Sequence, residues 1–212
     1  RRDGSNVLLP EEKYSVAVHE TGHALVAALS EHADPVAKIT ILPAGRALGV
    51  TEQLPVDERH LYPESYLRDS LAIRLGGFAS ESLVLGEPST GASSDLGGAT
   101  ELAVHMVRDW GLSPRLGPIG YGDQGPGYLG SGQLQSRPYS EGTQQAIDEE
   151  VSRLLSEAKG RAMDLLNANR DVLDAVVARL MDKESMSGDE LREILRQTVA
   201  ARMPSNLATI SS

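Results

Sequence analysis

The sequence predicts a mainly α-helical protein with a small β-hairpin or sheet. Apolar residues recur at helical spacing through most of the chain, whereas a β-branched, loosely alternating pattern is confined to residues 36–53. Glycine-rich residues 111–138 then separate the first half from a C-terminal run of helical segments. With 212 residues and 40% hydrophobic content, the chain can bury a proper core. We therefore expect a core built on a helix that carries His-Glu-x-x-His, followed by a C-terminal helical bundle.

The first helix is expected over residues 10–31, because Pro10 suits a first helical position and a long apolar flank follows it. Residues 36–42 alternate loosely and are rich in β-branched residues, and a Pro-Ala-Gly turn then leads into a second expected strand over residues 46–53, which predicts a hairpin. An extended peptide can add to the edge of such a hairpin as a further strand. A hairpin that only covers the core is the equally weighted alternative.

Two further helices are expected before the glycine-rich span, over residues 63–85 and 95–109. Gly76-Gly77 interrupts the first of them. Each glycine inside a helix costs about 1 kcal/mol relative to alanine, so the pair indicates either close approach of another backbone or a kink.

The domain organisation follows from these segments. Residues 1–9 have no periodicity and predict a tail or the stub of a linker, and residues 204–212 predict a flexible tail. We expect one unit over residues 10–203, divided into a catalytic core (10–110), a glycine-rich loop that forms a lid or a mobile segment (111–138) and a helical bundle (139–203). The bundle helices are expected over residues 140–167, 170–182 and 187–201, the last opened by a capping box at Ser187 and Glu190.

Composition excludes several classes of function. A formal charge of −10 and a pI near 5.0 argue against a nucleic-acid surface and against contact with an anionic membrane. The absence of cysteine excludes disulfides, thiolate zinc fingers and a cysteine nucleophile. No apolar run approaches 18 residues, and the chain has no G-x-x-x-x-G-K-[ST] motif. We therefore expect a soluble fragment without a membrane span or a phosphate-binding loop of its own.

The chemistry is expected at His19, Glu20 and His23. Positions four apart share one face of a helix, so both imidazoles can reach a single ion. Zinc accepts imidazole nitrogen readily, and a catalytic zinc site uses three protein ligands plus water, for which Glu20 is placed as the base. Two packed histidines that merely align are the alternative, and the helical context favours the metal site.

The third ligand must lie farther along the chain, because Val26 and Leu29 occupy the positions where the extended motif requires glycine and histidine. Four candidates remain open: Glu81, Asp95, Glu101 and His105. Asp95 follows a loop of small residues at a helix start, where plain capping is an equally good explanation. Glu101 and His105 suit a surface pair, whereas Glu81 suits either solvent or a hydrogen bond to a ligating imidazole.

Several ordered blocks of sequence resemble the peptidase domain of the FtsH family, the ATP-dependent, membrane-anchored zinc metalloproteases. The similarity covers about residues 11–200. Its blocks are His19-Glu20-Thr21-Gly22-His23-Ala24, Asp34-Pro35-Val36, Ile39-Thr40-Ile41-Leu42-Pro43, Arg46-Ala47-Leu48-Gly49-Val50-Thr51, Leu75-Gly76-Gly77, Ser89-Thr90-Gly91-Ala92-Ser93-Ser94-Asp95, Trp110-Gly111, Leu116-Gly117-Pro118, Tyr139-Ser140 and Ile147-Asp148-Glu149-Glu150.

The resemblance implies zinc ligands at His19, His23 and Asp95 and a catalytic glutamate at Glu20. It also implies a mainly helical fold with a small β element, a homo-hexameric ring, and substrate along the strand edge near residues 39–42. Two positions depart from the family pattern, Phe78 and Ser82, and they bear on local packing and on the role of Glu81. The family's transmembrane segments and ATPase module are expected to precede residue 1, with this domain on the cytoplasmic side of the membrane.

The function expected on this basis is zinc-dependent hydrolysis of peptide bonds in unfolded or membrane protein substrates, as part of protein quality control. ATP would act only through the ATPase module of the parent chain. A non-catalytic, ring-forming assembly module is the competing hypothesis, and a zinc hydrolase of small molecules is a third. Loss of Glu20 or of a metal ligand would favour the assembly module, and the sequence retains both histidines and Glu20.

Overall fold

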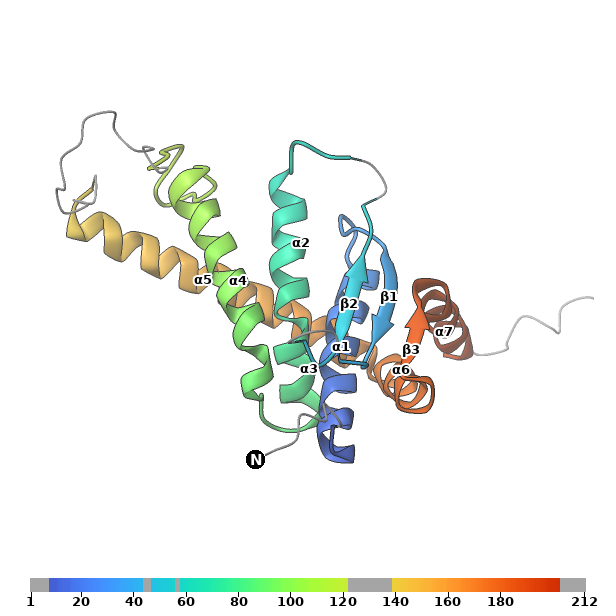
Figure 1. Ribbon diagram of the computed structural model, residues 1–212. Helices are drawn as coiled ribbons and strands as arrows, with labels where there is room; N and C mark the ends of the chain where they lie inside the picture. Colours follow the sequence, from blue (N-terminus) through green and yellow to red (C-terminus); the bar gives the residue numbers. More distant parts are fainter. Residues whose placement is uncertain (1–7, 44–46, 56–57, 122–138, 203–212) are drawn as a thin grey trace, which may run out of the picture.

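The computed structural model describes residues 8–43, 47–55, 58–121 and 139–202. Helix α1 (Pro10–Leu29) lies at the centre, in contact with helices α2 (Glu64–Arg74), α3 (Gly76–Val84), α5 (Glu141–Ala168) and α6 (Arg170–Lys183). It also contacts strands β1 (Val36–Thr40) and β2 (Val50–Gln53). In Figure 1 the sheet and α6 lie on one side of α1, and α4 (Ser93–Val104) lies on the other. The prediction of a mainly helical protein with a small sheet is confirmed.

Helix α1 is buried because much of its length is apolar. Pro10 occupies its first turn, as predicted, and the helix ends where Ser30 becomes extended and its N–H bonds to the Ala27 carbonyl. Its buried apolar residues come from several faces: Ala17, Val18, Ala24, Leu25, Val26 and Ala27. Any polar side chain on this central helix must therefore find partners within the protein.

The helix expected over residues 63–85 divides at Leu75 into α2 and α3. The following glycines allow close packing, because a Cβ added to Gly76 would lie 2.7 Å from the carbonyl oxygen of Gly22 in α1. Only a residue without a side chain permits two helix backbones to approach this closely. Of the two alternatives expected for the Gly76-Gly77 pair, the close approach is confirmed, and the helix is interrupted at Leu75, the residue that precedes the pair.

The sheet has three antiparallel strands in the order β2-β1-β3. The hairpin of β1 and β2 is confirmed, with Ile39 opposite Thr51, although part of its turn lies outside the described residues. Strand β3 (Ser185–Ser187) was not predicted, and it pairs with the other side of β1. The edge expected to be open near residues 39–42 is therefore occupied, and that expectation is wrong. An edge that the described strands leave open belongs to β2.

The remaining helices agree with the predicted ranges. Helix α4 follows a short 3-10 turn (Thr90–Ala92) and continues into a π-helical turn (His105–Asp109), so the helix expected over residues 95–109 is confirmed. Of the glycine-rich loop, residues 122–138 lie outside the described residues, and residues 111–121 form no helix or strand.

The C-terminal helices share one core with the first half of the chain. Ser140 caps α5, and Ser187 and Glu190 form the expected capping box of α7 (Gly188–Ala201). Helix α5 contacts α2, α3 and α4, whereas α6 packs on α1 and α7 on α6. The C-terminal helices thereby support the helix that carries the histidines.

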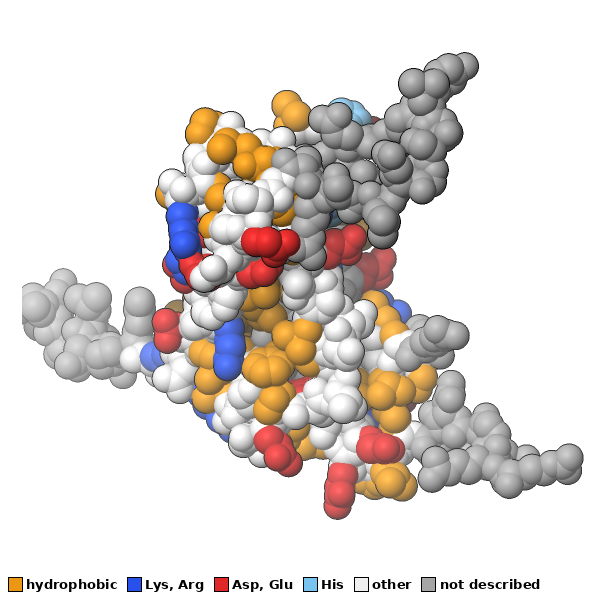
Figure 2. Space-filling model, turned by 90° about the vertical axis from the view of Figure 1, so that its left-hand side faces the viewer, with side chains coloured by type: hydrophobic (Ala, Val, Ile, Leu, Met, Phe, Trp, Pro, Cys, Tyr) orange, Lys and Arg blue, Asp and Glu red, His pale blue; other side chains and the backbone are white. Residues whose placement is uncertain are grey.

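The outer surface agrees with the acidic composition. Figure 2 shows Asp and Glu side chains dispersed over the described part of one face, where Lys and Arg stand singly. Within the described ranges, no helix is both long and apolar enough to span a bilayer.

Candidate metal and catalytic site

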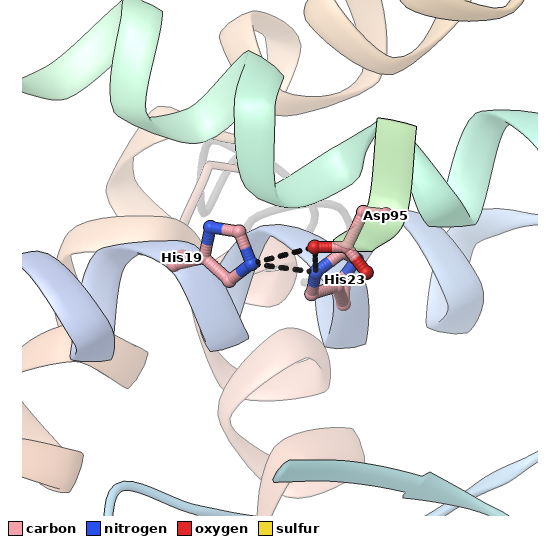
Figure 3. A group of neighbouring side chains, drawn as sticks. All are labelled: His19, His23 and Asp95. Atoms are coloured by element: carbon pink, nitrogen blue, oxygen red, sulfur yellow. Dashed lines mark hydrogen bonds and ion pairs between the residues drawn. The ribbon is translucent and has the colours of Figure 1, made fainter. Parts of the chain in front are cut away.

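His19 and His23 point to the same side of α1, as their spacing predicts. Their rings meet edge to face with centroids 4.7 Å apart, and their Nε2 atoms are 3.0 Å apart. Figure 3 shows these two nitrogens directed at a common point. The His-Glu-x-x-His motif therefore places two imidazole nitrogens where both can bind one metal ion.

Asp95 joins this pair from the first turn of α4. Its Oδ2 atom lies 3.1 Å from His19 Nε2 and 3.4 Å from His23 Nε2. The N-cap residue of the helix is Ala92, three residues before Asp95, and the polar partners of the Asp95 carboxylate are the two histidines. Plain capping is therefore not the role of Asp95. Ligand atoms of the three residues all lie within 4.8 Å of one another.

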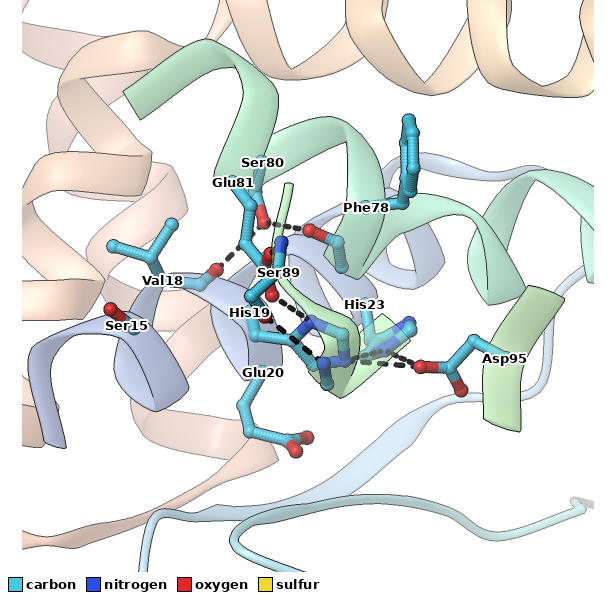
Figure 4. A network of polar contacts seen from close by, with 12 residues as sticks. Ser15, Val18, His19, Glu20, His23, Phe78, Ser80, Glu81, Ser89 and Asp95 are labelled. Carbon is cyan, nitrogen blue, oxygen red and sulfur yellow. Dashed lines mark hydrogen bonds and ion pairs between the residues drawn. The ribbon is translucent and has the colours of Figure 1, made fainter. Parts of the chain in front are cut away.

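A second layer of hydrogen bonds holds each imidazole. His23 Nδ1 lies 2.7 Å from the Ile73 carbonyl oxygen, and His19 Nδ1 lies 2.7 Å from Glu81 Oε1. Glu81 is only 1% exposed, and its other oxygen accepts the backbone N–H of Ser89. Figure 4 shows Glu81 reaching down to the His19 ring from α3. Of the alternatives for Glu81, the hydrogen bond to an imidazole is confirmed and exposure to solvent is wrong.

These partners determine which nitrogen of each ring carries the hydrogen. A carbonyl oxygen and a carboxylate can only accept, so Nδ1 is the donor in both His19 and His23. In the neutral rings both Nε2 atoms then present lone pairs to each other and to a carboxylate oxygen of Asp95. Three electron pairs that converge at this distance repel one another unless a proton or a metal cation lies among them.

The electrostatics of the site lead to the same conclusion. Burial lowers the pKa of His19, but hydrogen bonds to Asp95 and Glu81 outweigh burial, and the pKa is raised overall. Burial by itself would raise the pKa of Asp95, yet its hydrogen bonds to His19 and His23 hold that pKa well below its usual range. The site therefore favours an ionised carboxylate and positive charge beside it.

The donor set fits zinc. Two imidazole nitrogens and one carboxylate oxygen are ligands that zinc takes in catalytic sites, with a fourth position left for water. Ligand atoms about 2.0–2.2 Å from a tetrahedral zinc lie about 3.3–3.6 Å from one another. The separations of 3.0, 3.1 and 3.4 Å observed here are within a few tenths of an ångström of that spacing.

Glu20 lies on the opposite side of His19 from Glu81 (Figure 4). It is 7% exposed, and its Oε2 accepts a hydrogen bond of 2.7 Å from the Thr51 hydroxyl of β2. Gly49 packs on the same side chain, because a Cβ added there would lie 2.8 Å from Glu20 Oε1. The Glu20 carboxylate is thus enclosed by Gly49, which precedes β2, and by Thr51 of β2.

The second glycine of the Gly76-Gly77 pair has a role in the site that the sequence did not reveal. A Cβ added to Gly77 would lie 2.6 Å from both ring nitrogens of His19. The sequence indicated close approach of a backbone, but not that the space belongs to an imidazole. The contacts of Thr51 and Gly49 with Glu20 were also missed, because nothing in a strand pattern marks them.

The other candidates for the third ligand lie elsewhere. Glu101 is exposed on α4, and His105 bonds through Nδ1 to Asp109 Oδ2 at 2.6 Å while it stacks on Trp110. Phe78 and Ser82, which depart from the family pattern, are linked by a hydrogen bond from Ser82 Oγ to the Phe78 carbonyl oxygen. Neither departure disrupts the bond between Glu81 and His19.

A family model described as Peptidase family M41 matches residues 6–194. The chain belongs to peptidase family M41. This membership confirms the resemblance drawn from the ordered sequence blocks, and with it the expected class of enzyme, a peptidase.

Among relatives of this M41 chain is the ATP-dependent zinc metalloprotease FtsH of Acidothermus cellulolyticus, which is 59% identical over 200 residues. That match covers 94% of this chain and 30% of the relative. The protein of the same name from Acidimicrobium ferrooxidans is 48% identical over 195 residues, again 30% of its length. A third, from Pseudothermotoga lettingae, is 43% identical over 201 residues. The chain thus spans about 30% of the length of the first two relatives.

Proposed function

We propose that this M41 chain is a zinc-dependent endopeptidase whose metal is held by His19, His23 and Asp95. The observation that carries the proposal is the convergence of two imidazole lone pairs and one carboxylate oxygen, each ring oriented by a hydrogen bond at its other nitrogen. Such an arrangement is unfavourable without a cation and favourable with one. The names of the relatives, which are called zinc metalloproteases, agree with it.

Zinc, when bound, would polarise the peptide carbonyl and make water a better nucleophile near neutral pH. Glu20 would act as the base: its carboxylate accepts a proton from the attacking water and passes it to the departing amine as the C–N bond breaks. Its position one residue after His19 and its enclosure by β2 support this role. Glu81 would keep the His19 ring oriented and its Nε2 directed at the ion.

The substrate is proposed to add to the open edge of β2 rather than to β1. Ile41 N–H bonds to the Glu184 carbonyl beside β3, and Leu54 N–H bonds to the Pro35 carbonyl ahead of β1. Because backbone groups alternate in direction along a strand, both bonds imply that Thr51 and Gln53 direct their N–H and C=O groups outward. An extended peptide can pair with those groups, so unfolded segments are the expected substrates.

The wider setting is proposed from the resemblance and from the relatives' names. The parent protein would combine residues 10–203, as the peptidase unit, with an ATPase module that delivers unfolded or membrane protein substrates. Assembly as a homo-hexamer, anchoring in a membrane with this domain on the cytoplasmic side, and a role in protein quality control remain predictions. The non-catalytic assembly module stays the competing hypothesis, and retention of Glu20 beside the ligands argues against it.

Substitution of the base tests the proposal. The zinc-loaded protein should degrade unfolded casein, and a chelator should stop the reaction. Glu20→Gln should retain one zinc per chain and lose casein hydrolysis by roughly a hundredfold or more. Glu101→Gln is the matched control, because this carboxylate is exposed on α4 and is not one of the three proposed ligands. Full activity in Glu20→Gln would remove Glu20 from the mechanism, and chelator-resistant activity would remove the metal.

A further inference from the structure

Thr51 makes a side-chain contact that its place in a strand does not require. We infer that Thr51 is a positioning residue that holds the Glu20 carboxylate in its reactive orientation. This inference rests on the proposed function, because it concerns the group that would act as the base.

The hydrogen bond is directed at the carboxylate. Thr51 Oγ1 lies 2.7 Å from Glu20 Oε2 and 3.0 Å from the Glu20 backbone carbonyl oxygen. A hydroxyl has one hydrogen, and bonds to ionised acceptors are shorter and stronger than bonds to neutral ones. The hydroxyl therefore donates mainly to Oε2, and the nearby carbonyl keeps it on the same side of α1.

A second residue of this segment, Gly49, also packs against the Glu20 side chain. Thr51 stands opposite Ile39, which is fully buried, so both side chains face α1 and the core. Two residues earlier, a Cβ on Gly49 would lie 2.7 Å from Glu20 Cγ and 2.8 Å from Oε1. Gly49 thus encloses the carboxylate without displacing it, while Thr51 binds it.

Holding the side chain matters because glutamate has three rotatable bonds, and a free glutamate samples many orientations. A base acts only within hydrogen-bond reach of the proton that it removes. The backbone N–H and C=O groups of Thr51 also point to the open edge of β2. Thr51 therefore fixes both the orientation of the proposed base, Glu20, and the position of the edge to which the peptide would bind.

A purely structural role for Thr51 would be to tie β2 to α1. Loss of such a tie would lower the melting temperature and raise KM, because the peptide edge would move. Loss of a positioning bond would lower kcat while zinc content and KM remain, because ligands and edge stay in place.

The test compares Thr51→Val, which removes the hydroxyl at nearly constant volume, with Thr51→Ser, which retains it. Each zinc-loaded variant is measured for zinc content, melting temperature, and kcat and KM on a fluorogenic peptide. We expect kcat of Thr51→Val to fall roughly tenfold to a hundredfold, with KM within about twofold of wild type, and Thr51→Ser to recover most of the activity. If Thr51→Val does not fold, Thr51→Ala against Thr51→Ser makes the same comparison.

Three results would overturn the inference: wild-type kcat in Thr51→Val, equal impairment in Thr51→Ser, or a loss that lies wholly in KM or zinc content. These results are distinct from failure of the proposed function. In that case the wild-type protein itself would lack chelator-sensitive hydrolysis, or Glu20→Gln would be fully active.

Discussion

Gly77→Ala tests whether the His19 ring fills the space beside Gly77, so that even one added methyl group disturbs metal binding. The added Cβ would lie 2.6 Å from both ring nitrogens of His19, whereas ordinary contact begins at 3.4 Å. The added Cβ would lie closer still to Cε1 of the ring, so the ring or the α3 backbone must move by at least about 0.8 Å, which is several times the tolerance of about 0.2 Å for a metal–ligand distance. The ring cannot move freely, because its Nδ1 is bound to the buried Glu81.

The expected effect separates metal binding from folding. Alanine gains about 1 kcal/mol over glycine in a helix, while overpacking costs about 1–3 kcal/mol, so the free energy of unfolding without metal should fall by at most about 2 kcal/mol. Zinc affinity should fall by roughly tenfold to a hundredfold, as for loss of a group that orients a ligand. Titration with a competing chelator and thermal unfolding with and without zinc measure the two effects.

Two glycines provide matched controls. Gly97 in α4 and Gly160 in α5 have no atom within 4 Å of an added Cβ. Alanine at either position should leave zinc affinity unchanged and leave stability equal or slightly higher. Wild-type zinc affinity in Gly77→Ala would refute the argument that the His19 ring fills this space.

Three further predictions concern the same site. Asp95→Asn should leave the fold intact and weaken zinc binding by more than about tenfold; unchanged zinc content in a chelator competition would assign the third ligand elsewhere. Glu81→Gln keeps the size but not the charge of the group bound to His19 Nδ1, and zinc affinity measured by the same titration should fall by roughly tenfold to a hundredfold, with no change contradicting its role. The pKa of His19 is raised without metal, so its ionisation stabilises the metal-free fold below about pH 6.5 and that contribution is lost as pH rises through the folded pKa. Zinc requires the neutral ring, so the gain in melting temperature on adding zinc should shrink as pH falls from about 8 to about 6, and a gain independent of pH would contradict this.

Much of the fold could be predicted because its elements are marked locally. Pro10, the capping box at Ser187 and the long apolar stripes each determine structure within a few neighbouring residues. Strand β3 could not be predicted, because three residues carry no detectable alternation and its partners in β1 are about 145 residues away. Because β3 pairs with β1, the open edge of the described sheet belongs to β2, and the expectation of an open edge near residues 39–42 is wrong for the same reason.

In the site, too, contacts between residues close in the sequence could be predicted, whereas contacts between residues far apart could not. His19, Glu20 and His23 were recognisable because one helical turn brings them together. Asp95 was ambiguous from its surroundings, since capping and ligation both suit a carboxylate at a helix start, and only the resemblance favoured ligation. The bonds of Glu81 to His19 and of Thr51 to Glu20 join residues 62 and 31 positions apart, and no spacing rule reaches that far.

The central claim is that His19, His23 and Asp95 bind one zinc ion. Anomalous diffraction from crystals of the zinc-loaded protein, recorded on both sides of the zinc absorption edge, tests it most directly. We predict one strong peak about 2.0–2.2 Å from His19 Nε2, His23 Nε2 and Asp95 Oδ2. A peak at other residues, or a zinc ion held by the two histidines with Asp95 turned to solvent, would contradict the claim.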